Sequence, residues 1–185
     1  MYENLRRALS NFKNVLFPKD YLQKLKARGL KVGENFNMQQ GVIIDDSHCW
    51  HIEIGDDVTL APNVHILAHD ASTKIFLDYT KIGKVKIGNK VFIGASSVIL
   101  PGVTVGNNVV IGAGSIVNKD VEDNSVMVGN PAKKVMNIDT FIVNKRTEMS
   151  NFPLFEVEYT LDAGVSSSLK NKMNLKMNEN FGYIV

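Results

Sequence analysis

The chain has 185 residues, of which 44% are hydrophobic and 22% are charged, and its formal net charge is +2. This length suits one domain with small appendages, and the charge is too small to indicate binding to nucleic acid or to an anionic membrane. The single cysteine, Cys49, excludes an intrachain disulfide, and no stretch approaches the ~20 apolar residues of a membrane span. The N-terminus lacks the apolar core of a signal peptide. We therefore expect a cytoplasmic protein.

The first 30 residues have the spacing of amphipathic helices. Leu5 and Phe12 are two helical turns apart, and Pro18 begins a second stretch that places Tyr21 on an apolar face. Several lysines and arginines make this region basic, which leaves open a helix lying on a membrane surface. We favour a helical cap over residues 1–30 that packs on the end of the following domain.

The centre of the chain repeats with a period of six residues. This period fits neither a helix, with about 3.6 residues per turn, nor the alternation of an ordinary strand. Three short strands with a corner after each instead make one turn of a triangular coil, and such coils stack at roughly 4.8 Å per layer. The aliphatic residue of each unit, expected to point inward, is Ile54, Leu60, Ile66, Ile87, Ile93, Ile99, Val105, Ile111 or Val117. The residue three positions later, expected at a corner with positive φ, is Asp57, Asn63, Lys90, Ser96, Gly102, Asn108, Gly114 or Asp120.

These repeats predict an all-β fold, a parallel β-helix over residues 31–136. Stacked repeats need several coils and capped ends. The repeat is irregular over residues 32–50, which we expect to form the first coil. The pattern is lost over residues 137–185, which we interpret as a short C-terminal α/β tail. In this tail Ser166 is a candidate N-cap for a helix that carries Leu169.

The repeat breaks directly after His69. Ile66 predicts a corner at His69, and the next unit in frame begins only at Ile87, so we expect a loop over residues 70–84 to leave the coil here. Extended loops on rigid scaffolds often carry function. Histidine is the side chain best suited to proton transfer near neutral pH. His69 is therefore the candidate catalytic base.

The other histidines and the cysteine lie close to His69 in the sequence. With about 18 residues in a coil, His51 would lie one turn below His69 if the irregular part kept register. Three imidazoles from such coils can bind zinc, as in the γ-class carbonic anhydrases, but no third ligand that would match His65 and His69 is evident. We expect surface or packing roles for His51 and His65. Cys49, beside His48, has no neighbouring group that would activate it as an acyl carrier.

The repeats resemble the hexapeptide-repeat O-acetyltransferases, the family of the maltose, galactoside and nodulation-factor enzymes. They are most similar to the acetyltransferases of capsule, lipopolysaccharide and O-antigen synthesis. The resemblance implies a left-handed coil, a homotrimer, acetyl-CoA as co-substrate without a metal, and a sugar or glycan precursor as acceptor. It is carried by IEIGDDVTLAPNVHILAHDAST (52–73), VKIGNKVFIGASSVILPGVTVGNNVVIGAGSIVNKDV (85–121) and VMVGNPAKKV (126–135).

The resemblance also implies roles for single residues. His69 matches the catalytic base, and Asp46 matches the acceptor side of the cleft. Galactoside-type enzymes place an acceptor-binding asparagine where this sequence has Met38, and here His48 supplies a polar side chain instead. Asn118 stands where the family often has threonine. The positions implied to contact the coenzyme are Ala95, Ala113, Asn118, Lys119 and Lys133.

The reaction expected from these residues is direct acetyl transfer. His69 would take the proton from an acceptor hydroxyl as the oxygen attacks the thioester carbonyl. Three alternatives remain open at this point. They are an N-acetyltransferase acting on an amino-sugar nucleotide, a γ-type carbonic anhydrase, and a non-enzymatic β-helix used for binding or assembly.

Overall fold

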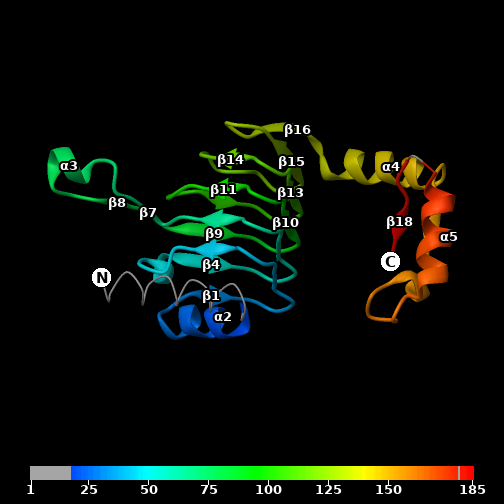
Figure 1. The fold of residues 1–185 in the computed structure, drawn as a ribbon. Helices are drawn as coiled ribbons and strands as arrows, with labels where there is room; N and C mark the ends of the chain where they lie inside the picture. Colours follow the sequence, from blue (N-terminus) through cyan, green and yellow to red (C-terminus); the bar gives the residue numbers. More distant parts are fainter. Residues whose placement is uncertain (1–17, 179) are drawn as a thin grey trace. The chain divides into compact units, whose positions relative to one another are not determined.

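The computed structural model describes residues 18–178 and 180–185 (Figure 1). The helix expected around Leu5 and Phe12 lies outside the described residues. The chain divides into two compact units, Met1–Ile138 and Asp139–Val185, and each is described by itself.

The first unit is a parallel β-helix wound from three sheets of short strands. Each of the first four coils contributes one strand to the first, the second and the third sheet in turn, and Figure 1 shows the coils stacked on one another. The first sheet contains β1 (Lys31–Val32), β4 (Ile52–Ile54), β9 (Val85–Ile87) and β12 (Thr104–Val105). The second contains β2 (Asn37–Met38), β5 (Thr59–Leu60), β10 (Val91–Ile93), β13 (Val109–Ile111), β15 (Ser125–Val128) and the antiparallel β16 (Lys133–Asn137). The third contains β3 (Ile43–Ile44), β6 (His65–Ile66), β11 (Val98–Ile99) and β14 (Ile116–Val117).

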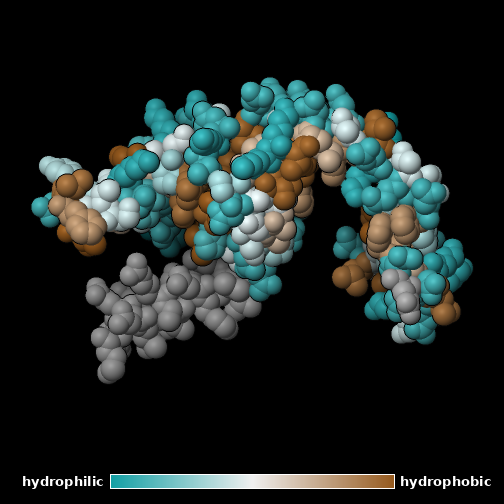
Figure 2. All heavy atoms as spheres, turned by 90° about the horizontal axis from the view of Figure 1, so that it is seen from above, coloured by the Kyte–Doolittle hydropathy of each residue, from teal (hydrophilic) through white to brown (hydrophobic). Residues whose placement is uncertain are grey.

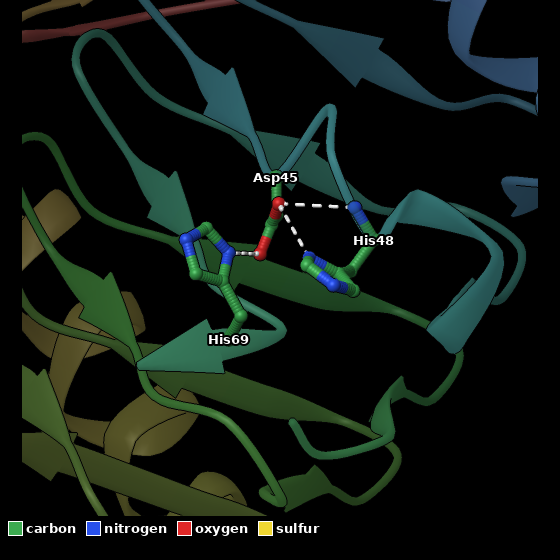
Figure 3. Close-up of side chains that lie close together, drawn as sticks. All are labelled: Asp45, His48 and His69. Atoms are coloured by element: carbon green, nitrogen blue, oxygen red, sulfur yellow. Dashed lines mark hydrogen bonds and ion pairs between the residues drawn. The ribbon is translucent and has the colours of Figure 1, made fainter. Parts of the chain in front are cut away.

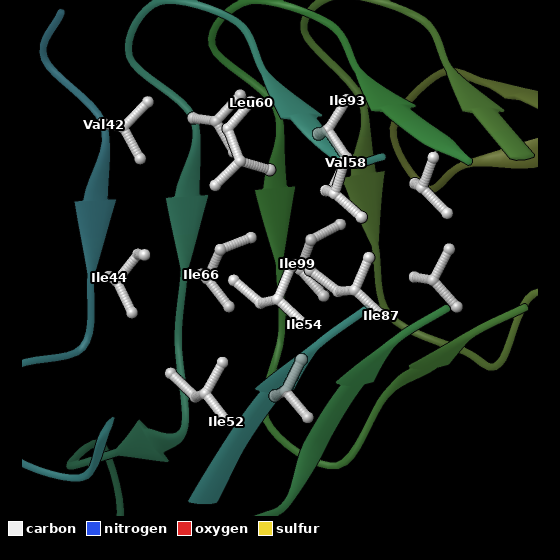
Figure 4. Close-up of a cluster of buried hydrophobic side chains, with 14 of the residues drawn as sticks. Val42, Ile44, Ile52, Ile54, Val58, Leu60, Ile66, Ile87, Ile93 and Ile99 are labelled. Atoms are coloured by element: carbon white, nitrogen blue, oxygen red, sulfur yellow. The ribbon is translucent and has the colours of Figure 1, made fainter. Parts of the chain in front are cut away.

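The aliphatic repeat forms the core of this unit. All nine positions that the period of six placed inside are at most 4% exposed. They stack from coil to coil, and Figure 4 shows one such column in Ile44, Ile66 and Ile99. Burying an isoleucine or valine side chain is worth about 1.5–3 kcal/mol. The stacked columns therefore hold neighbouring coils together.

The corners follow the prediction at seven of eight positions. Asp57, Asn63, Lys90, Ser96, Asn108, Gly102 and Gly114 all have positive φ. The prediction is wrong for Asp120. Its carboxylate instead accepts a hydrogen bond from the backbone N–H of Thr104 at 2.7 Å, in a coil that is shorter than the others.

A ladder of hydrogen bonds runs along one corner of the β-helix, and the sequence separation between its successive members gives the number of residues in each coil. Between the first and the second sheet, the side-chain oxygens of Asp56, Asn89, Asn107 and Asp123 each accept a hydrogen bond from a backbone N–H in the preceding coil. The successive steps of this ladder, which begins at Glu34, span 22, 33, 18 and 16 residues. Only the third step has the length that three six-residue units predict.

The first coil is longer because it carries a 3-10 turn, η1 (Cys49–His51), at the corner between the third and the first sheet. This turn shifts the register. The expectation that His51 lies one turn below His69 is therefore wrong. His48 comes close to His69 instead, with 4.9 Å between the two ring centroids.

The second coil is longer because an arm leaves it directly at His69. Strands β7 (His69–Asp70) and β8 (Lys81–Ile82) pair antiparallel, and helix α3 (Lys74–Leu77) lies at the tip (Figure 1). The segment 70–84, expected as a loop, thus has secondary structure of its own. Figure 2 shows apolar side chains gathered at the tip of this arm, where Ile75, Phe76 and Leu77 are exposed.

Helix α2 (Pro18–Ala27) packs against the first coil. Tyr21 and Leu25 are buried in the same hydrophobic cluster as the coil residues. The Tyr21 hydroxyl donates a hydrogen bond to the backbone oxygen of Ile44 at 2.8 Å and accepts one from the N–H of Ile44 at 3.1 Å. Burial raises the pKa of Tyr21 to about 12, so the hydroxyl stays protonated and able to donate at physiological pH.

The second unit comprises two helices and a small parallel sheet. Ser166 caps α5, since its side chain accepts a hydrogen bond from the N–H of Leu169 at 3.2 Å. Among the described residues of this second unit, Phe155 and Tyr159 have buried side chains. The elements are α4 (Ile138–Met149), β17 (Leu154–Phe155), η2 (Val157–Tyr159), α5 (Ser167–Met177) and β18 (Tyr183–Ile184). Within the described parts of both units, none of the helices combines the length and the apolar character that a bilayer crossing requires.

Candidate active site

The candidate base lies at the corner between the third and the first sheet. His69 begins strand β7 and directly follows Ala68, which is fully buried. The His69 side chain is 34% exposed. The core therefore fixes the backbone at this point, while part of the imidazole remains open to a ligand.

Asp45 lies beside His69, at the same corner of the preceding coil (Figure 3). Its carboxylate is almost fully buried, and Nδ1 of His69 lies 2.5 Å from Oδ2. The backbone N–H of Ala68 donates to Oδ2 at 2.9 Å. The N–H groups of Ser47 and His48 donate to Oδ1 at 3.1 and 3.2 Å. Each carboxylate oxygen thus accepts two hydrogen bonds.

These contacts set the charge of Asp45 and the tautomer of His69. Burial alone would raise the pKa of Asp45, but the hydrogen bonds from His69 and from the N–H of Ala68 outweigh it, and the pKa lies below its ordinary value. An ionised carboxylate only accepts hydrogen bonds, so Nδ1 of His69 carries the proton. This leaves a lone pair on Nε2, the atom that a general base needs.

His48 forms the other side of this cluster. Its Nδ1 lies 3.9 Å from Oδ1 of Asp45, which is too far for a hydrogen bond, and this buried atom has no other partner among the described residues. Its ring also lies near Trp50 and His51, at centroid distances of 5.4 and 6.4 Å. The 3-10 turn thus places His48 beside His69. A contact of His48 with the acceptor stays a prediction.

A metal is a second chemical possibility for these side chains. Asp45, His48 and His69 each offer one ligand atom, and these atoms lie within 4.8 Å of one another. However, four donors already occupy the oxygens of Asp45, so an ion would have to displace the bond to His69. His65, which the carbonic anhydrase alternative pairs with His69, lies instead on the outer face of the third sheet, between Ile43 and Val98. The arrangement favours a hydrogen-bonded carboxylate–histidine pair.

Sequence reasoning missed Asp45 as the partner of His69. It named the next residue, Asp46, for the acceptor side of the cleft, and that role stays a prediction. Asp46 is exposed and forms an ion pair with Arg28 at 3.8 Å. One feature of the sequence could have indicated Asp45, because it directly follows Ile44, an inward-pointing residue at the end of a strand. An assumed coil of 18 residues could not align Asp45 with Ala68, because the real first coil is longer.

A hollow of about 610 Å³ opens beside His69 and extends toward the later coils. Its volume falls within the range of roughly 300–1,000 Å³ of small-molecule sites. The structure thereby brings Asn118, one of the positions expected to contact the coenzyme, to the same hollow as His69. The lining residues are Leu67, His69, Asp70, Ala71, Lys81, Leu100, Pro101 and Asn118.

The other expected coenzyme positions lie in three places. Lys119 is exposed beside Asn118, on the same corner as His69. Ala95 and Ala113 lie one above the other at the corner between the second and the third sheet, where the N–H of Gly114 donates to the backbone oxygen of Ala95 at 2.8 Å. Lys133 is exposed at the start of β16. One copy of the chain therefore separates His69 from Ala95 and Ala113 by the width of the third sheet.

Comparisons with known proteins agree with this architecture. A family model described as bacterial transferase hexapeptide (six repeats) matches residues 84–119. Protein CapG of Staphylococcus aureus is 45% identical over 126 residues, which are 64% of this chain and 72% of CapG. The crystal structure of a maltose O-acetyltransferase from Clostridium difficile 630 matches with 43% identity and a TM-score of 0.55, over 60% of this chain and 59% of that one.

A galactoside acetyltransferase in complex with coenzyme A matches with 36% identity and a TM-score of 0.55, over 68% of this chain and 60% of the enzyme. The chain thus spans less than two thirds of both solved proteins, and the same holds for several further relatives. The match to hexapeptide-repeat acetyltransferases implies that the β-helix of this chain is left-handed. The repeat, the stacked coils and the extensive identity with CapG show that this chain belongs to the hexapeptide-repeat O-acetyltransferase family.

Proposed function

We propose that this chain transfers an acetyl group from acetyl-CoA to a hydroxyl of a sugar or glycan precursor, with His69 as general base. The observation that carries the proposal is the pair of Asp45 and His69. A buried carboxylate holds the Nδ1 proton of His69 and leaves Nε2 available beside a hollow of about 610 Å³.

The chemistry follows from this pair. Nε2 of His69 accepts the proton of the acceptor hydroxyl while the oxygen forms a bond to the thioester carbonyl carbon. The C–S bond then breaks, and the imidazolium returns the proton to the leaving thiolate of coenzyme A. Asp45 stabilises the imidazolium that forms in between. A positioned base contributes a factor of about 10²–10⁴ to the rate.

The hollow supports a donor site on the later coils. From His69 it runs past Leu100 and Pro101 to Asn118, with Lys119 next in sequence. Lysines suit the phosphates of a coenzyme, because charge-assisted hydrogen bonds to phosphate are stronger than neutral ones. The galactoside acetyltransferase that this fold matches was solved with coenzyme A, which supports the same donor here.

A second copy of the chain would complete the site. Ala95 and Ala113 lie on a different edge from His69, so both edges meet in one cleft only if two copies lie side by side. The outer face of the third sheet, between these edges, carries a column of Ile43, His65, Val98 and Ile116, of which all but His65 are apolar. Head-to-tail contacts of this kind close into rings. We propose a homotrimer in which neighbouring copies share each site.

Free-thiol release from acetyl-CoA tests the reaction. The purified chain would be incubated with sugars, sugar nucleotides and amino-sugar nucleotides, and the acetylated product identified by mass spectrometry. We expect release that depends on a hydroxyl acceptor. Acetylation of the amine alone would replace O-transfer with N-transfer. No acceptor-dependent release from the whole panel would overturn the proposed function.

A further inference from the structure

One further aromatic side chain, Trp50, lies close to the candidate base. Trp50 is 51% exposed and is the single tryptophan of the chain. Its ring centroid lies 5.4 Å from that of His48, which in turn lies 4.9 Å from that of His69. Trp50, His48 and His69 thus form a continuous row of rings that leads away from the base.

This row and the hollow lie on opposite sides of His69 along the stack of coils. His48 and Trp50 belong to the first coil, whereas Leu100 and Asn118, which line the hollow, belong to the third and fourth. If the donor occupies the hollow, the acceptor must approach Nε2 of His69 from elsewhere. The first coil offers the row of rings as a surface for the acceptor, whose reacting hydroxyl would then extend past the His69 ring to Nε2, on the side away from Asp45 and His48 (Figure 3).

Buried neighbours fix the position of Trp50. The adjacent Cys49 is fully buried, and its thiol donates to the backbone oxygen of Leu25 at 3.6 Å. A side chain at Gly29 would place its Cβ only 2.9 Å from the Cβ of Trp50. The 3-10 turn therefore packs directly against the end of α2. These contacts fix the backbone and the Cβ of Trp50, so the position from which the indole extends is already set before a ligand binds, which lowers the cost of ordering it.

We propose that Trp50 is a stacking platform for the pyranose ring of the acceptor; this inference rests on the proposed function. The face of an indole carries negative charge density, which attracts the weakly positive C–H groups on one face of a sugar. The polar residues of the same corner, Asp46, His48 and His51, supply hydrogen-bond partners for hydroxyls at the rim of the ring. A few polar groups around an aromatic surface are typical of sites that orient a small ligand.

Fluorescence tests this platform without any turnover. Since the chain has one tryptophan, its emission reports on Trp50 alone. Titration of the intact protein with pyranoses, without acetyl-CoA, should change the emission in a saturable way. Serine, which carries a hydroxyl but no ring, should leave it unchanged. If the emission responds to dilution of the protein but to no sugar, Trp50 is a contact between copies, and the proposal is overturned.

Kinetics provide the second test. Trp50→Ala should raise the KM for the sugar acceptor roughly three- to tenfold, with the KM for acetyl-CoA unchanged. Trp50→Phe should restore most of the loss, because it keeps an aromatic face. Leu161→Ala, at an exposed position of the second unit, is the matched control and should change neither constant.

The two proposals fail in distinguishable ways. An unchanged acceptor KM in Trp50→Ala, with transfer intact, overturns the platform and leaves the proposed function standing. If the wild type acetylates no hydroxyl, the proposed function fails. The fluorescence titration then still decides whether a sugar binds at Trp50, and the absence of any saturable change overturns the platform as well.

Discussion

Asp45 and His69 belong to successive coils and meet through a hydrogen bond of 2.5 Å between Oδ2 and Nδ1, although 24 residues separate them in the sequence. The pair therefore forms only when the first two coils are stacked. Two further features hold it in place, the burial of Asp45 and the N–H of Ala68, which donates to the same oxygen. The proposed base is thus built into the scaffold rather than carried by a mobile segment.

Replacement of His69 should remove catalysis and leave the fold intact. We expect His69→Ala to lower kcat by a factor of about 10² or more. The melting temperature should fall only modestly, because Asp45 loses the hydrogen bond from His69 but keeps the N–H donors of Ala68, Ser47 and His48. Thiol release and thermal unfolding measure the two effects. Lys170→Ala, at an exposed position on α5 of the second unit, is the control. Half of the wild-type activity in His69→Ala would refute the assignment.

Replacement of Asp45 should act through His69. In Asp45→Asn the amide no longer stabilises an imidazolium and allows the other tautomer of His69, so kcat should fall by roughly 10²–10⁴ with a small change in KM. The pH profile of kcat should shift as well, which a loss of stability alone would not produce. Asp57→Asn, at an exposed corner with positive φ, is the control. An unchanged pH profile in Asp45→Asn would exclude the positioning role.

Asp45 should also contribute to stability above acidic pH. Its pKa in the folded state is lowered from 3.8, so its contribution is present above that value and is lost as the pH falls through the folded-state pKa. Urea unfolding between pH 7 and pH 3 should show a smaller acid-induced loss of free energy in Asp45→Asn than in the wild type. Equal acid dependence in both proteins would contradict this linkage.

The raised pKa of Tyr21 predicts that the free energy of unfolding falls at alkaline pH. Its pKa is raised from 10.0 to about 12, so its contribution to stability is complete below pH 10 and is lost as the pH rises toward 12. Tyr21→Phe leaves the N–H and C=O of Ile44 without their partner, which costs about 1–3 kcal/mol. Urea unfolding at pH 8 and pH 11 should show that the variant is less stable at pH 8 and that the difference narrows at pH 11. A constant difference would refute the prediction.

The donor assignment predicts a selective effect at Lys133. Loss of one exposed charge near the coenzyme phosphates should raise the KM for acetyl-CoA in Lys133→Ala severalfold, with kcat nearly unchanged. An acetyl-CoA analogue that lacks the 3′-phosphate should show a smaller difference between variant and wild type. Lys170→Ala, on α5 of the second unit, is the control. Equal KM values for Lys133→Ala and the wild type would remove Lys133 from the donor site.

The shared site predicts complementation between two inactive proteins. The variant His69→Ala lacks the base. The variant Ala113→Glu should prevent coenzyme binding on the neighbouring copy, and it should leave the core undisturbed because Ala113 is exposed. Mixed trimers formed by refolding both variants together contain some interfaces with an intact His69 and an intact Ala113. Partial activity should return. Inactive mixtures that contain mixed trimers by native mass spectrometry would exclude sharing.

The period of six was sufficient to predict the core and most corners, because each inward residue and each positive φ depends on local spacing. It could not locate Asp45. That position depends on how many residues the first coil contains, and η1 adds residues without any aliphatic signal. The break after His69 predicted where the chain leaves the coil. The antiparallel pairing of β7 with β8 depends on contacts between residues that share no repeat, so spacing could not reveal it.

The ladder of hydrogen bonds from Glu34 to Asp123 is continuous, although its successive members are 22, 33, 18 and 16 residues apart in the sequence. Additional residues therefore enter at the corner that carries His69, while the opposite corner keeps its register. Such a scaffold can change residues at one corner without moving the aliphatic columns. If the proposed acceptor platform is correct, exchange of residues 46–51 between related chains should change the acceptor that is used, while the β-helix stays folded.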